Sequence, residues 1–307
     1  MTFPGISLKI NLTEYSACGR NRGRIPGGEE KGETCPMKQE IKLVAVDMDG
    51  TFVRSDYTYD VPRFQRLLGR MEAAGCHFVV ASGNQYYQLR DIFPGYHQEL
   101  AFVAENGAFV KDGEELVFAA DVPGETVNAV IDLCRAYPEI SNVLCGLDSA
   151  YCQRGTVSQE FFDRTRIYYH RLRWVEDLKE VKDQILKFAP VVPEEKTEFY
   201  YELFREKLKG KMAPASSGRG AIDLILPGCH KASGLKRLAE RWNVTPAQCA
   251  AFGDGGNDVE MLRYCGYSYA MANAPEYVKK AAKSVCPSNE QDGVLSTLEQ
   301  LFGQTPA

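Results

Sequence analysis

The sequence has 307 residues, with 36 Lys and Arg against 41 Asp and Glu, so its formal net charge is −5. Hydrophobic residues make up 44% and charged residues 25% of the chain, which excludes bulk disorder and fibrous repeats. The acidic balance argues against a protein that coats nucleic acid, because that affinity comes mainly from Lys and Arg. An acidic chain can still act on an anionic substrate if a bound cation and local dipoles supply a positive field.

Ten scattered cysteines form no CxxC pair, and several lie in apolar runs, so we expect reduced, buried thiols in a cytoplasmic protein. No apolar stretch approaches the ~18 residues that span a bilayer. Residues 1–38 are rich in Gly, Arg and Glu and lack the apolar core of a signal peptide. This segment is expected to be a flexible extension or the product of a misassigned start, with Met37 as the alternative start.

Strands and helices alternate from residue 41 onward. The apolar run at 41–46 is typical of a strand buried on both faces of a parallel sheet. Asp60 as N-cap and Pro62 in the first turn predict a helix that ends near Gly75. Strands at 76–81 and 100–104, a helix at 85–93 and a hairpin turn at 111–114 follow. This order predicts an α/β fold with a doubly wound, Rossmann-like parallel sheet.

The middle of the chain has a different pattern of predicted helices and strands. Helices at 126–137 and 194–208 alternate with few strands, which predicts a compact α+β insert at residues 121–219. The regular alternation returns with strands at 221–226, 249–252 and 267–271 and helices at 232–242, 258–264 and 294–302. The predicted core therefore covers residues 39–120 and 220–304.

Two carboxylate clusters follow predicted strands, at the sheet edge where ligands bind in open parallel sheets. Asp47 and Asp49 come directly after the strand at 41–46 and are followed by Gly and Thr. Asp254 and Asp258, with Asn257 between them, lie on a glycine-rich turn after the strand at 249–252. Surface turns also collect Asp and Gly, but oxygen donors at this spacing suit a hard cation such as Mg²⁺.

Two further clusters could bind an anion. Ser82, Gly83 and Asn84 follow the strand at 76–81 and offer a hydroxyl and backbone N–H groups, although the same residues also suit a helix N-cap. Lys231 begins a helix, where the helix dipole disfavours a cation unless it faces a phosphate; a solvated surface lysine is the alternative. Together the four clusters predict a phosphoryl-transfer site with Mg²⁺ and an Asp nucleophile.

The segments 47–51, Ser82, Lys231 and 253–258 resemble the four motifs of the haloacid dehalogenase (HAD) superfamily. The insert between the second and third motifs is similar to the type IIB cap of Cof-type sugar phosphatases, and residues 105–108, 271–274 and 289–294 match further. The resemblance covers about residues 39–304. Asn84 is a departure, since many relatives carry Arg after the Gly, and this affects the expected leaving-group contact.

The resemblance implies a role for each residue. Asp47 is the expected nucleophile, and Asp49 the general acid and base. Mg²⁺ is expected on the Asp47 carboxylate, the Asp49 backbone carbonyl, Asp254 and, directly or through water, Asp258. Phosphate or substrate contacts are expected from Ser82, Gly83, Asn84, Lys231 and Asn257, the last of which binds phosphate or orients Lys231.

The expected activity is Mg²⁺-dependent hydrolysis of small phosphorylated metabolites, sugar phosphates first. Two alternatives stay open: a phosphotransferase or mutase that uses the same intermediate, and a non-catalytic phosphometabolite sensor. The expected partner is a small phosphorylated molecule, with neither nucleic acid nor membrane. The sequence does not give the oligomeric state, and nothing in it demands a partner subunit.

Overall fold

The computed structural model describes residues 40–218 and 220–303, so the extension expected at 1–38 lies outside the described residues. The first of its two sheets has eight strands. Their bounds are β1 Leu43–Val46, β2 His77–Ala81, β3 Ala101–Ala104, β4 Phe109–Asp112, β5 Glu115–Ala119, β12 Cys249–Gly253, β13 Tyr267–Met271 and β14 Ser284–Cys286. The spatial order is β14–β13–β12–β1–β2–β3–β4–β5, parallel as far as β3 and antiparallel at β4 and β5.

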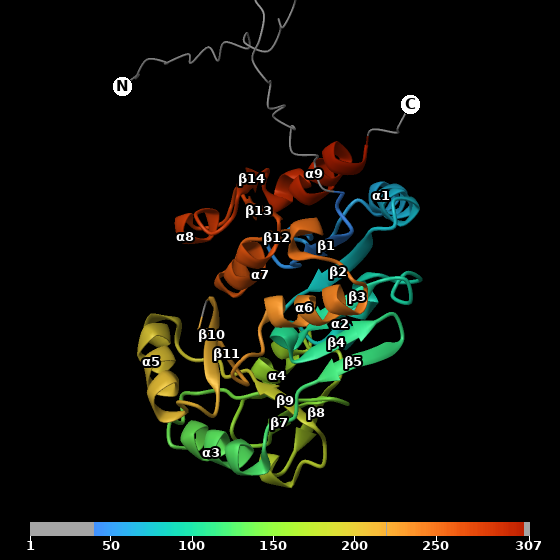
Figure 1. Cartoon of the computed structure of the whole chain (residues 1–307). Helices are drawn as coiled ribbons and strands as arrows, with labels where there is room; N and C mark the ends of the chain where they lie inside the picture. The colour runs from blue at the N-terminus through green and yellow to red at the C-terminus, as the bar shows by residue number, and fades with distance from the viewer. Residues whose placement is uncertain (1–39, 219, 304–307) are drawn as a thin grey trace, which may run out of the picture. The chain divides into compact units, whose positions relative to one another are not determined.

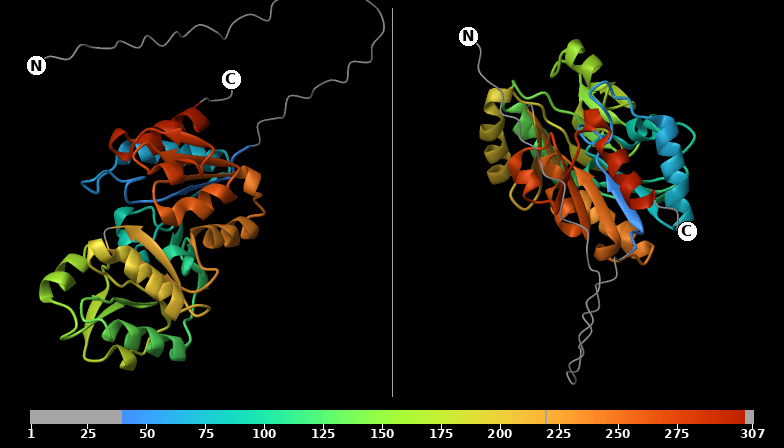
Figure 2. Two further views of the ribbon diagram at one scale, coloured as in Figure 1. Left: turned by 90° about the vertical axis from the view of Figure 1, so that its left-hand side faces the viewer. Right: turned by 90° about the horizontal axis from the view of Figure 1, so that it is seen from above.

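Helices cover both faces of this sheet (Figures 1 and 2). Their bounds are α1 Val61–Ala73, α2 Tyr86–Ile92, α6 Lys231–Arg241, α7 Val259–Tyr264, α8 Glu276–Lys279 and α9 Gly293–Phe302. Alternate residues of β1 point to opposite faces, so Val44 and Val46 pack with α1, α2 and α9, while Leu43 and Ala45 pack with α6, α7 and α8. The doubly wound α/β prediction is confirmed.

The second sheet has six strands and is mostly antiparallel. Its strands are β6 Leu144–Gly146, β7 Ala150–Gln153, β8 Leu172–Val175, β9 Ile185–Phe188, β10 Ala213–Gly218 and β11 Ala221–Ile225, in the order β10–β11–β9–β6–β7–β8. Helices α3 Gly124–Arg135 and α5 Thr197–Lys207 pack on one face, and α4 Gln159–Thr165 packs on the other. The α+β character of this region agrees with the prediction.

Two details of the prediction are wrong. The strand expected at 221–226 as the return of the first sheet is β11, and it pairs with β9 and β10 of the second sheet. The expectation of few strands also fails, because β7, β8 and β10 are short or carry polar residues and give little periodic signal. The division into a core and an inserted domain at 121–219 stays a prediction.

The eight cysteines in the described ranges are free and buried, as expected. Within those same ranges, no helix combines the length and apolar character that a bilayer crossing requires.

Candidate active site

The loop after β1 is a tight turn that holds Asp47 and Asp49. The Met48 carbonyl accepts hydrogen bonds from the backbone N–H groups of Thr51, Phe52 and Val53, which folds the chain back at once. Gly50 sits at φ +73°, and a Cβ there would lie 2.5 Å from Asp254 Oδ2. The turn therefore requires glycine for its backbone conformation and for the close approach of Asp254.

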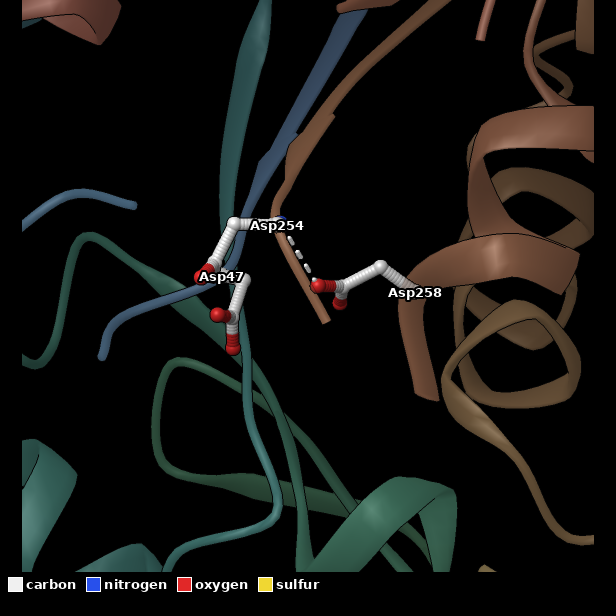
Figure 3. A group of neighbouring side chains, drawn as sticks. All are labelled: Asp47, Asp254 and Asp258. Atoms are coloured by element: carbon white, nitrogen blue, oxygen red, sulfur yellow. Dashed lines mark hydrogen bonds between the residues drawn. The ribbon is translucent and has the colours of Figure 1, made fainter. Parts of the chain in front are cut away.

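Three carboxylates converge at the carboxyl ends of β1 and β12 (Figure 3). Asp47 follows β1, Asp254 follows β12, and Asp258 ends the short 3₁₀ turn η5 (Gly256–Asp258). One oxygen from each lies within 4.8 Å of the others. The side chains of Asp47 and Asp258 are almost fully buried, and Asp254 is partly buried.

Lys231 joins two of these carboxylates. Its Nζ lies 2.5 Å from Asp47 Oδ1 and 2.7 Å from Asp258 Oδ1, and the side chain is 1% exposed. Lys231 is the first residue of α6, where His230 Nδ1 accepts the Ser233 N–H as N-cap. The alternative of a solvated surface lysine is therefore wrong. The two buried carboxylates offset the unfavourable position of a cation at a helix N-terminus.

The site has more negative than positive charge. Burial, and then repulsion from Asp258, raises the pKa of Asp47 well above its ordinary value, although Lys231 pulls it down. The same two causes raise the pKa of Asp254 to about 6. Burial opposes the charge on Lys231, but Asp258 and Asp47 outweigh it and raise the pKa of the ammonium. A further positive charge at this point would relieve the repulsion.

The donor set suits a hard divalent cation, because all three side chains offer carboxylate oxygens. Asp258 is already occupied, since Oδ1 binds Lys231 and Oδ2 accepts the backbone N–H groups of Asp254 and Gly255. Asp47 Oδ2 accepts no hydrogen bond from the described residues. Asp254 is oriented by Thr51 Oγ1 at 2.9 Å. Asp47 and Asp254 thus fit as direct ligands, and Asp258 fits as the group that holds Lys231 and the loop.

The Asp49 carboxylate lies outside the group of three. Its Oδ2 accepts a hydrogen bond from Asn84 Nδ2 at 2.7 Å, and burial raises the pKa of Asp49 although this bond lowers it. Asn84 also donates its backbone N–H to Ser82 Oγ. The loop after β2 therefore lies beside the loop after β1, as the strand order predicts.

Among the described residues, Asn257 forms a side-chain hydrogen bond with neither Lys231 nor Asp47. Its Nδ2 donates to Asn106 Oδ1 at 3.0 Å, and Asn106 lies in the 3₁₀ turn η1 (Glu105–Gly107) after β3. Three residues that contact the site loops had no predicted role. Thr51 donates to Asp254, Asn106 accepts from Asn257, and Asn273 Nδ2 donates to the Gly50 carbonyl. Each follows a predicted strand, so position at a strand end was the available signal.

Comparisons with known proteins identify the family of this chain. The model of the haloacid dehalogenase-like hydrolase family matches residues 44–298. The 5-amino-6-(5-phospho-D-ribitylamino)uracil phosphatase YbjI of Escherichia coli is 40% identical over 262 residues, which is 85% of this chain and 96% of that protein. The enzyme of the same name in Bacillus subtilis, YitU, is 26% identical, covering 87% of this chain and 99% of its own.

Solved structures of related proteins have the same fold. The crystal structure of SMU.1108c from Streptococcus mutans superposes with a TM-score of 0.83 at 36% identity, covering 86% of this chain and all of that one. The HAD subclass IIB sugar phosphatase BT4131 has the same fold, with a TM-score of 0.68 at 22% identity, covering 85% and 99% of the two chains. A particular likeness to the sugar phosphatase SupH, indicated by residues 80–89 and 145–151, stays a prediction. With a family match over most of its length and a relative 40% identical, this chain belongs to the haloacid dehalogenase-like hydrolases.

Proposed function

We propose that this hydrolase is a Mg²⁺-dependent phosphomonoesterase whose nucleophile is Asp47. The observation that carries the proposal is the buried contact of Asp47 with Lys231, beside the Asp254 carboxylate, which pairs with no Lys, Arg or His among the described residues. This arrangement leaves Asp47 Oδ2 available to a substrate phosphorus, while Oδ1 keeps a second lone pair for a cation beside Lys231. Bound Mg²⁺ would be held by Asp47, the Asp49 carbonyl and Asp254, and would neutralise charge on the phosphoryl oxygens.

The chain's own groups account for each bond and proton. An Asp47 oxygen forms a bond to phosphorus as the ester P–O bond breaks, and Asp49 gives its proton to the leaving alcohol. Burial of Asp49 supports this step because it favours the protonated form. Water then attacks the phosphorus of the aspartyl phosphate, Asp49 takes the proton from that water, and the Asp47 carboxylate leaves as inorganic phosphate forms.

Lys231 and the loop after β2 would hold the phosphoryl oxygens. The Lys231 ammonium is fixed beside Asp47 by Asp258, so it stays next to the reacting phosphorus throughout. Ser82 Oγ and the Gly83 N–H lie in the neighbouring loop. Asn84 contacts Asp49, and this contact supports a role near the leaving oxygen, where the family more often has Arg.

The second sheet would act as the cap that excludes water and selects the leaving group. The Gln85 side chain, just before α2, forms two hydrogen bonds with the backbone of Arg171, the residue before β8 of the second sheet. These bonds support a cap that lies next to the phosphate-binding loop. The expected boundaries of 121–219 are best extended to the end of β11, because β11 pairs within the second sheet.

The substrate we propose is a phosphate ester on the end of a polyhydroxylated chain, either a sugar or a ribityl group. Sugar phosphates are the expectation from the sequence. The two related phosphatases YbjI and YitU are named for a substrate whose phosphate is carried by a ribityl chain. Both leaving groups are primary alcohols, which need a proton as they leave, and Asp49 would donate that proton.

The test is phosphate release from a panel that holds sugar phosphates, 5-amino-6-(5-phospho-D-ribitylamino)uracil, nucleotides and p-nitrophenyl phosphate, ranked by kcat/KM. Asp47→Asn should abolish turnover of every member and keep the circular dichroism spectrum. Undiminished hydrolysis in Asp47→Asn would sink the nucleophile assignment, and binding without Mg²⁺-dependent release would favour a sensor. Adding sugar acceptors and measuring transferred against free phosphate distinguishes a phosphotransferase.

A further inference from the structure

A second buried lysine, Lys187, lies where the two sheets meet. It stands on β9 and is 1% exposed. Its Nζ donates to the Gly83 carbonyl at 2.7 Å and to Asp223 Oδ1 at 3.0 Å, and it forms an ion pair with Glu105 Oε2 at 3.0 Å. Asp223 lies on the neighbouring strand β11, whereas Gly83 and Glu105 follow β2 and β3. One cation of the second sheet thus binds oxygens at the carboxyl edge of the first.

The contact with Gly83 completes a pattern. The carbonyls of Ser82, Gly83 and Asn84 are each bound: Ser82 by the Asn106 N–H at 3.1 Å, Gly83 by Lys187, and Asn84 by the Glu105 N–H at 3.1 Å. In a trans peptide the N–H points opposite to the carbonyl of the same unit. The bound Ser82 carbonyl therefore sets the direction of the Gly83 N–H, and the bound Gly83 carbonyl sets that of the Asn84 N–H.

The Gly83 N–H is the donor that this leaves available. It has no hydrogen-bond partner among the residues that the structure describes, whereas the Asn84 N–H is bound to Ser82 Oγ. An oriented, unpaired N–H beside a serine hydroxyl is suited to an anion. Its direction is set by the Ser82 carbonyl of the same peptide unit, which the Asn106 N–H binds.

The turn that supplies the other two donors is conformationally demanding. Glu105 and Asn106 have φ values of +50° and +54°, in the left-handed region that non-glycine residues rarely adopt. Such conformations persist when surrounding contacts over-determine them. Here Lys187 binds the Glu105 side chain, and Asn106 is held by Asp223 and by Asn257.

We propose that Lys187 is a positioning residue for the phosphate-binding loop. By holding the Gly83 carbonyl from the second sheet it fixes the Asn84 N–H that binds Ser82 Oγ, and by pairing with Glu105 it holds the turn whose Asn106 N–H binds the Ser82 carbonyl. This inference deepens the proposed function and rests on it for the identity of the anion. It also makes the second sheet part of the phosphate site, because Lys187 and Asp223 are both strand residues of that sheet.

A purely structural buried ion pair is the competing explanation. Such a pair contributes little net stability when all its members are replaced by apolar residues, but the loss of one member alone is strongly destabilising. The two explanations differ in what a replacement changes. Loss of a structural pair alters stability alone, whereas a loosened loop weakens phosphate binding in protein that is still folded.

The test compares Lys187→Met, which keeps most of the length of the side chain, with Lys283→Met, a control at an exposed lysine. Lys283 Nζ also donates to backbone carbonyls, those of Cys265 and Gly266, but these residues precede β13, at the edge of the sheet away from the site. Binding of inorganic phosphate in the presence of Mg²⁺ is measured by titration calorimetry, and KM and kcat with p-nitrophenyl phosphate. Folding is followed by circular dichroism.

Lys187→Met should weaken phosphate binding and raise KM about tenfold, the scale of one hydrogen bond to a charged group, with a smaller change in kcat. Lys283→Met should change neither. Wild-type phosphate affinity in folded Lys187→Met, or an equal loss in Lys283→Met, overturns the inference. If Lys187→Met does not fold, the isosteric variant Asp223→Asn takes its place, because it weakens the contact that holds Lys187. Asp223→Asn should weaken phosphate binding about threefold, less than the loss of a whole hydrogen bond to a charged group. Unchanged phosphate affinity in Asp223→Asn would then overturn the inference. Calorimetry needs no turnover, so an inactive wild type would count against the proposed function alone.

Discussion

Replacing Gly50 by Ala adds a single methyl group at the most crowded point of the site. Gly50 has φ +73°, and its added Cβ would lie 2.5 Å from Asp254 Oδ2 and 3.0 Å from Asp254 Cγ. The backbone turn is fixed by three hydrogen bonds to the Met48 carbonyl, so the carboxylate has to give way. Two separate costs follow, one in the backbone and one in the position of Asp254.

The backbone cost concerns stability. An L-residue in the left-handed region costs about 1–2 kcal/mol, which lowers Tm by a few degrees for a protein of this size. The positional cost concerns function. Bringing Asp254 Oδ2 from 2.5 Å to the 3.4 Å of an ordinary contact needs a shift of about 0.9 Å. A displacement of about 1 Å in a positioned group costs on the order of 10²-fold in rate.

Gly95→Ala separates the two costs. Gly95 has φ +88°, and nothing lies within 4 Å of its added Cβ, so Gly95→Ala has only the backbone cost. We expect both variants to lose a similar amount of free energy of unfolding in urea. Only Gly50→Ala should lose about 10²-fold in kcat and need more Mg²⁺ for half-maximal activity. Wild-type kcat and Mg²⁺ dependence in Gly50→Ala would refute the role of Asp254 as a positioned ligand.

Three further outcomes follow from the site and its surroundings. Asp49→Asn should lower kcat for sugar phosphates about 10²–10⁴-fold but still give a burst of p-nitrophenol from p-nitrophenyl phosphate, whose leaving group needs no proton; steady wild-type turnover contradicts the acid/base role. Mg²⁺ should raise Tm by a few degrees at saturation, and Asp254→Asn should abolish most of that rise; an equal rise in both would place the ion elsewhere. Hydrogen bonds from Arg63 lower the pKa of Glu299, so their stabilisation is present above its ordinary value of 4.5 and is lost as pH falls through the lower folded value. Glu299→Gln should therefore remove less than about 1 kcal/mol near pH 7, since the pair is partly exposed, and should flatten the decline in stability below pH 4.5.

The residues of the site were predictable because they follow a rule of position. Asp47, Ser82 and Asp254 each come directly after a strand with a strong apolar signal, and parallel strands bring their carboxyl ends to one edge. The sequence therefore indicated which residues meet before any distance was known. Lys231 was indicated by its helix start and lies buried between two carboxylates, and its contact with phosphate stays a prediction.

Lys187 and Asp223 escaped prediction for the opposite reason. They lie inside strands rather than after them, and their contacts depend on which sheet β9 and β11 join. Strand pairing between segments far apart in sequence leaves no local trace, so β11 was assigned to the first sheet on its apolar pattern alone. The visible signal is a charged residue within an otherwise apolar strand, Lys187 in β9 and Asp223 in β11, because such a residue is buried only when it is paired.

The two buried lysines explain why only one of the clusters is suited to a cation. Lys187 binds two carboxylates, those of Glu105 and Asp223, so one negative charge is in excess there. Lys231 also binds two, but the third carboxylate of Asp254 lies beside them and is held by a hydroxyl and an amide rather than by a cation. The excess of negative charge around Lys231 is therefore larger, and the carboxylate oxygens there still have free lone pairs. A divalent cation there would turn a net negative site into one that attracts a phosphate, which is how an acidic chain can act on an anionic substrate.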